Sequence, residues 1–171
     1  MRVRERDVGF WVAGARLAAV PFAFLEVAVE RGNYPAGHEA WAWALAAVFA
    51  AGALVFARLP GLALAPLLFD LLVASGFVLL YAFELGTPVR QLLLLPVLEA
   101  GLRFGVRGGA AAAVAVVPAL ALFEWRQAVR LDLYPFDPGH VLGPFGIALL
   151  VGIAFGLAAG GALGRRGVKN V

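Results

Sequence analysis

Long apolar stretches alternate along this chain with short breaks rich in glycine, proline and charge. A helix that crosses a bilayer needs about 20 mostly apolar residues, and the apolar stretches approach or reach that length. None of them alternates polar and apolar positions with the period of two that is typical of a β-strand. We therefore expect an all-α fold, an integral membrane six-helix bundle, with helices at about residues 8–29, 40–57, 62–83, 88–102, 106–123 and 141–164.

Composition supports lipid as the solvent of this fold. The chain is 63% hydrophobic and 15% charged, whereas soluble domains are about 45–50% apolar and about 25% charged. A soluble fold of this length would leave much of that apolar surface in water. We find no linker between the apolar stretches, so residues 1–171 are expected to form a single transmembrane domain with the lipid bilayer as its first partner.

The distribution of positive charge predicts the orientation of the bundle. With six spans both termini lie on one side, and cationic residues favour the cytoplasmic side. The terminal side carries Arg2, Arg4, Arg6, Arg58, Arg103, Arg107, Arg165, Arg166 and Lys169. The other side carries Arg31, Arg90, Arg126 and Arg130. We expect a multi-pass membrane protein with both termini in the cytoplasm. Because the basic residues stand at segment ends, nucleic acid is not an expected partner.

Asp70 stands in the middle of an apolar helix, in "LALAPLLFDLLVASGFVLLY". An unpaired aspartate at the centre of a bilayer costs about 2.5–3.5 kcal/mol, so this side chain should face the bundle interior and have a partner. Arg16 is the natural candidate, because both residues lie roughly 12 Å from the cytoplasmic ends of their helices at 1.5 Å per residue. The pair is either a static brace between helices, a proton-sensitive switch, or the wall of a polar ligand pocket.

A second pair of opposite charges follows in "LLLLPVLEAGLRFGVRGG". Glu99 precedes Arg103 by four residues, which favours an ion pair along one face of a helix. Arg103 and Arg107 flank the expected cytoplasmic turn and reach phosphate headgroups there. The Glu99–Arg103 pair is either a structural clamp at this turn or a site that titrates or binds a cation.

Two further features concern the outer side and the last helix. Glu26 either reaches the outer interface or lines an outward cavity with Asp70, Tyr81 and Glu84, and such a cavity would favour cationic ligands. Glycines recur every fourth residue in the last helix, which lets another backbone approach closely. They are Gly152, Gly156, Gly160 and Gly164. Their partner is the first or the fifth helix of the same chain, since we favour an intramolecular contact, or the same helix of a second copy.

No constellation of residues that carries out catalysis is recognisable. The sequence has no cysteine, no Walker loop and no HExxH motif, and the two histidines, His38 and His140, stand in separate outer loops. We therefore expect no catalytic residue, no bound metal and no cofactor, and do not expect an enzyme.

The run "LLFDLLVASGFVLLYAFELGTPVRQLLLLPVLEAGLRFGVRGGAAAAV" resembles the multi-span N-terminal membrane region of bacterial sensor histidine kinases and diguanylate cyclases, particularly the actinobacterial kind. Asp70, Glu99, Arg103 and Arg107 match that pattern. The resemblance implies a sensory domain embedded in the bacterial cytoplasmic (inner) membrane, in a two-component or related signal-transduction system. Such a domain passes a stimulus to a cytoplasmic output domain or partner protein by helix repacking, and it often forms a homodimer. Members of the family continue into an output domain, whereas this sequence ends at "GRRGVKNV", so we expect an isolated input domain or a separate partner.

A second resemblance comes from a different class of membrane protein. Substrate-binding subunits of energy-coupling-factor vitamin transporters also have about six spans, and "LPVLEAGLRFGVRGGAAAAV" is similar to one of their hairpins. This alternative implies a bound vitamin and small-residue helix faces, on the first and last helices, that contact a coupling subunit.

Overall fold

The computed structural model describes residues 2–31, 33–59, 61–83, 88–131 and 135–167. Every regular element within these ranges is helical, which confirms the expected all-α class. The elements are α1 (Arg2–Val29), α2 (His38–Ala57), α3 (Leu64–Leu80), the 3-10 helix η1 (Pro88–Leu93), α4 (Leu94–Ala115), α5 (Val117–Leu131) and α6 (Gly139–Gly167). Compared with the sequence-based boundaries, α5 extends well beyond residue 123 and α3 is shorter than expected.

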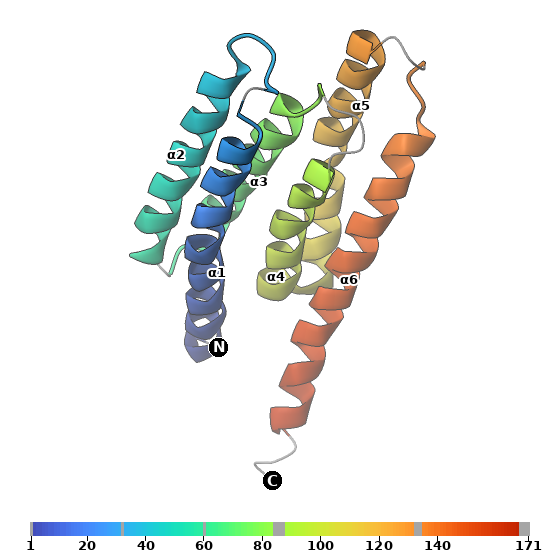
Figure 1. The fold of residues 1–171 in the computed structure, drawn as a ribbon. Coiled ribbons are helices and arrows are strands. Elements are labelled where there is room, and N and C mark those ends of the chain that lie inside the picture. The colour runs from blue at the N-terminus through green and yellow to red at the C-terminus, as the bar shows by residue number, and fades with distance from the viewer. Residues whose placement is uncertain (1, 32, 60, 84–87, 132–134, 168–171) are drawn as a thin grey trace.

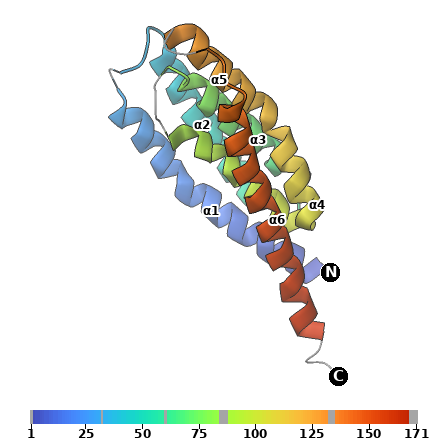
Figure 2. The same cartoon turned by 90° about the vertical axis from the view of Figure 1, so that its right-hand side faces the viewer.

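The helices lie side by side as an elongated bundle (Figure 1). α1, α2 and α3 form one half, α4, α5 and α6 form the other, and α3 packs against both η1 and α5 across the boundary. The start of α1 and the end of α6 lie at the same end of the bundle, and both helices extend past their neighbours there (Figure 2). We refer to this end as the terminal end and to the opposite one as the distal end.

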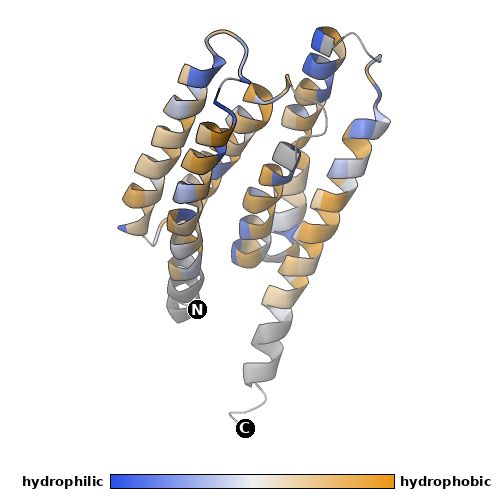
Figure 3. Cartoon of the chain, viewed as in Figure 1, coloured by the Kyte–Doolittle hydropathy of each residue, from blue (hydrophilic) through white to orange (hydrophobic). Residues whose placement is uncertain are grey.

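Helix length and composition are those of a protein that crosses a membrane several times. Four helical stretches in the described residues are long and apolar enough to do so: Gly9–Val29, His38–Ala57, Arg90–Arg130 and Gly139–Gly160. Hydrophobic residues cover the helices, while hydrophilic ones gather at helix ends and loops (Figure 3). Large apolar side chains point outward, among them Trp11, which is 75% exposed, and Leu72, which is 72% exposed. The bundle therefore suits an apolar surrounding.

The longest apolar stretch reverses direction at Gly105. This residue has φ 72° and ψ −163° inside α4, a backbone conformation essentially restricted to glycine. Gly101 and Gly109 both approach Gly152 of α6, although eight helical residues would span roughly 12 Å in a straight helix. Residues 94–104 and 106–115 are therefore two antiparallel arms, which we call the first and second arms of α4. The reversal lies in the turn that the sequence places between residues 102 and 106.

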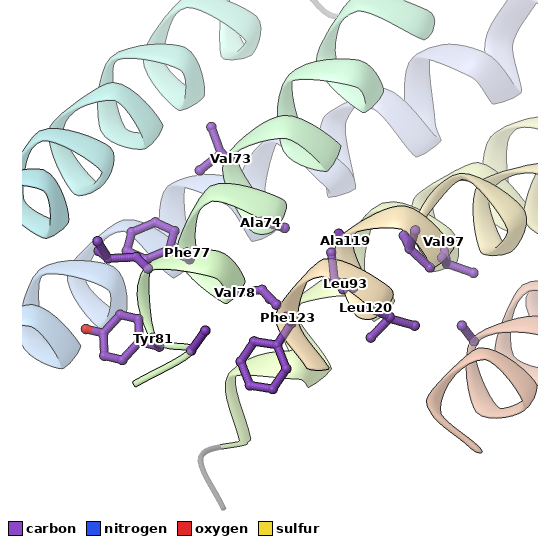
Figure 4. Packing of buried hydrophobic residues seen from close by; sticks show 14 of the residues in the cluster. Val73, Ala74, Phe77, Val78, Tyr81, Leu93, Val97, Ala119, Leu120 and Phe123 are labelled. Carbon is purple, nitrogen blue, oxygen red and sulfur yellow. The ribbon is translucent and has the colours of Figure 1, made fainter. Parts of the chain in front are cut away.

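A hydrophobic core joins the two halves toward the distal end (Figure 4). It combines one face of α3 with the end of η1, the start of α4 and α5, and residues of α1, α2 and α6 also belong to it. Its labelled members in Figure 4 are Val73, Ala74, Phe77, Val78, Tyr81, Leu93, Val97, Ala119, Leu120 and Phe123. Asp70 precedes Val73 by one helical turn and Glu99 follows Val97, so the buried charges begin where this core ends.

Candidate functional site: a buried charge network

Arg16 links two carboxylates inside the bundle. Its Nε donates to Oδ2 of Asp70 at 2.7 Å, and its Nη2 donates to Oε2 of Glu99 at 2.6 Å. Arg103 completes the group, because its Nε donates to Oε1 of Glu99 at 2.7 Å. All four side chains are largely buried, with 13% exposure for Asp70 and less for the others. Two positive and two negative charges balance one another in this network.

Three helices bring these residues together. Arg16 comes from α1, Asp70 from α3, and Glu99 and Arg103 from successive turns of the first arm of α4. The expected contacts of Arg16 with Asp70 and of Glu99 with Arg103 are both present. Arg16 also bonds Glu99 and so joins the two pairs, a contact that was not predicted from the sequence. The order of the charged residues and their depth along each helix can be read from the sequence. Which side of each helix faces the interior of the bundle cannot.

The network holds the halves of the bundle together beyond the end of the apolar core. Taking charges out of a polar solvent is costly, and the cost is offset only when each charge has close partners. Asp70 Oδ1 is buried with no hydrogen-bond partner in the described part of the chain. One acceptor of the network is thus open while the other three carboxylate oxygens are occupied. Arg107, also expected near the turn, is exposed on the second arm of α4.

The glycines of α6 pack within the chain. A Cβ atom built on Gly156 would lie 2.6 Å from Cα of Val106, and one on Gly152 would lie 2.7 Å from the carbonyl carbon of Gly109. From the other side, a Cβ atom on Gly101 would lie 2.8 Å from the carbonyl oxygen of Gly152. The favoured intramolecular contact of Gly152 and Gly156 is therefore present, and its partners are both arms of α4.

Gly160, the next glycine of the stripe, does not share this contact, because it has open space where its Cβ would be. The surroundings of Gly164 lie outside the described residues. Within the described residues, the glycines of the stripe that α4 approaches closely are Gly152 and Gly156.

The residues of the expected outer cavity have different surroundings. Tyr81 is almost completely buried, and its hydroxyl bonds that of Tyr34; both rings also pack against Phe83. Partial burial raises the pKa of the Tyr34 hydroxyl above its ordinary value of 10.0. Glu26 is exposed on α1, and Glu84 lies outside the described residues. The recorded hydrogen bonds of these residues thus join Tyr81 to Tyr34 and Asp70 to Arg16.

A polar cluster that the sequence analysis missed lies at the distal end. Glu124 of α5 has a side chain only 1% exposed, with its Oε1 2.9 Å from Nδ1 of His140. Arg90 of η1 lies near the same carboxylate and over the ring of Phe123, 4.9 Å from its centroid. This cluster was not predicted, because the charged residues between 124 and 140 suggested a loop. Within the described residues no group of three or more His, Cys, Asp or Glu side chains is placed to hold a metal ion.

Comparison with known proteins gives no match to a protein-family model, to a curated protein or to a solved structure. Structural evidence on the function of this chain therefore comes from the buried charge network, the polar cluster at the distal end and the contact between α4 and α6.

Proposed function

We propose that this chain is the membrane-embedded input domain of a bacterial signal-transduction protein, with six spans and both termini in the cytoplasm. The start of α1 and the end of α6 lie at the same end of the bundle, which supports this topology (Figure 1). The proposed cytoplasmic face is the terminal end, on which the positive-inside pattern places the larger group of arginines. A stimulus would be received in the bundle and passed to a cytoplasmic output domain or partner protein.

The observation that carries the proposal is the position of Gly101 between Glu99 and Arg103. One face of the first arm of α4 belongs to the charge network, and the same turn touches the backbone of α6 through Gly101. A rearrangement of the network would therefore move the arm that supports α6. Backbones in such close contact have little room to adjust separately.

α6 is the element suited to carry this movement out of the membrane. It contacts both arms of α4 near its middle and then continues past the other helices at the terminal end (Figures 1 and 2). A stimulus shifts the arrangement only if it interacts differently with the two states of the bundle. In one state the four charges are paired as described; in the other, Arg16 releases at least one carboxylate and the halves separate on the α1 side.

Distance measurements between spin labels test this proposal. The chain has no cysteine, so cysteines at Leu17 of α1 and Leu157 of α6 would carry the labels; these side chains are 39% and 62% exposed. We expect Asp70→Asn to shift or broaden the distance distribution, because Arg16 loses a charged partner. Glu26→Gln removes an exposed carboxylate and serves as the control. Identical distributions in Asp70→Asn and the unaltered protein, both folded, would argue against transmission through the network.

The vitamin-transporter alternative has less support from the helix packing. It needs small-residue faces of the first and last helices for a coupling subunit, but Gly152 and Gly156 are already occupied by α4. Purification of the chain from its native membrane with a transport ATPase, or with a bound vitamin, would favour this alternative over the input domain.

A further inference from the structure

The start of α6 is fastened to α5 through a buried carboxylate at the distal end. Oε1 of Glu124 lies 2.9 Å from Nδ1 of His140. Oε2 is buried without a hydrogen-bond partner in the described ranges, and the nearest cationic atom recorded is Nη1 of Arg90 at 3.9 Å. The carboxylate is 1% exposed but the histidine side chain is 53% exposed. One side of the ring is therefore exposed, while the other contacts a buried acceptor.

A second carboxylate faces the opposite nitrogen of the same ring. Asp137 accepts the backbone N–H of Gly139 through Oδ1 at 2.8 Å, which caps the first turn of α6. Its Oδ2 lies 3.8 Å from Nε2 of His140. Glu124 and Asp137 thus approach different ring nitrogens, so the three side chains do not converge on one point as the ligands of a metal ion would. The ligand that this geometry suits is a proton on the imidazole.

We propose that the stimulus of this input domain is the proton concentration on the outer side of the membrane, read by His140. This inference rests on the proposed function in two respects. The distal end must lie on the outer side of the membrane, and α6 must transmit the movement to the terminal end. With one proton on the ring, Nδ1–H donates to Glu124 and Nε2 is an acceptor that faces another acceptor, Asp137. A second proton, taken from water, turns Nε2 into a donor. Both carboxylates are then bonded, and the first turn of α6 is held on α5.

The cluster combines a histidine with two carboxylates and an arginine. As a side-chain type, histidine gains or loses a proton between about pH 5 and 8, whereas arginine remains charged throughout that range. Arg90 from η1 lies near Glu124, and Asp137 from the turn before α6 lies near the ring. Gln127, buried one turn further along α5, is neutral. Lower pH therefore strengthens the contact between α5 and α6, and higher pH weakens it.

Spin labels across the proposed contact test this inference in the purified full chain. Cysteines at Val129 of α5 and Ile147 of α6, which are 63% and 56% exposed, would carry them. Between pH 8 and pH 5.5 we expect the distance population to shift toward the shorter form, with a midpoint between about pH 5 and 8. His140→Gln keeps an amide donor for Glu124 but does not titrate, and it should abolish the shift. His38→Gln alters the other histidine at the distal end and should leave it intact.

Two results would overturn the inference: a pH-independent distance in the unaltered protein, or an unchanged titration in His140→Gln. If His140→Gln does not fold, Asp137→Asn takes its place. Asp137 is exposed, and asparagine preserves the helix cap while removing the charge that faces Nε2. This variant should reduce the shift, and a full shift would again contradict the proposal.

Labels at Leu17 and Leu157 separate this inference from the proposed function. Suppose that the distance between Val129 and Ile147 changes with pH while the distance between Leu17 and Leu157 does not. This result would support the proton-dependent contact and count against transmission by α6. A distance between Val129 and Ile147 that does not change with pH, combined with a changed distance between Leu17 and Leu157 in Asp70→Asn, would contradict the proton proposal. The input-domain proposal would then remain supported.

Discussion

At the scale of single residues, Arg16 makes the contacts that link the most helices within the charge network. It is the one member of the network that bonds two carboxylates, Asp70 and Glu99, from two other helices. Replacing it leaves both acids buried, with only Glu99 still paired to Arg103. The consequence is set by uncompensated charge rather than by lost packing, because removal of one partner from a buried ion pair costs about 3–5 kcal/mol.

We therefore expect Arg16→Met to lower the free energy of unfolding by about 3–5 kcal/mol. Adding Asp70→Asn to that variant should restore part of the loss, since it removes the carboxylate left without a cation. Unfolding of both variants in mixed micelles, followed by helical circular dichroism, measures the difference. Equal stabilities of the single and double variants would show that Asp70 is not ionised against Arg16.

At the scale of elements, the pairing of α4 with α6 depends on where a side chain has room. A Cβ at Gly156 would lie 2.6 Å from Cα of Val106, whereas Gly160, one turn later, faces open space. Gly156→Leu should therefore push α6 away from the turn of α4, with a loss of about 1–3 kcal/mol or more. Gly160→Leu adds the same side chain without a neighbour and is the matched control. Thermal unfolding in detergent compares them, and equal midpoints would contradict the described packing.

The reversal of α4 makes a separate prediction for Gly105. Its φ of 72° with ψ of −163° is strained for any residue with a Cβ, at a cost of order 1–3 kcal/mol. Gly105→Ala should lower stability by about that amount, although nothing lies within 4 Å of the added atom. Gly14→Ala, in helical and open surroundings on α1, should be neutral or stabilising. A neutral Gly105→Ala, measured in the same unfolding assay, would mean that the turn has another shape.

At the scale of the whole molecule, hydropathy predicted most of the helices, because a helix that crosses a membrane is apolar over most of its surface. Helix ends were harder: charged residues after Phe123 suggested a loop, but α5 continues to Leu131 and buries Glu124 between helices. Depth along a helix is readable from residue counting, and so the contact of Arg16 with Asp70 was predictable. The direction in which a side chain points around the helix axis cannot be read from the sequence. The bond of Arg16 with Glu99 and the contact of Glu124 with His140 were therefore not predictable.

Orientation in the membrane remains the expectation on which sensing from outside depends. The loop between α1 and α2 lies at the distal end, and the loop between α2 and α3 lies at the terminal end (Figure 1). Ala36 and Gly61 are exposed positions in these two loops. In a chain with no native cysteine, a membrane-impermeant thiol reagent applied to intact cells should label Ala36→Cys at once. Gly61→Cys should react only after the membrane is opened, because the arginine-rich face is retained in the cytoplasm. The reverse pattern would place His140 in the cytoplasm, where it would report internal rather than external pH.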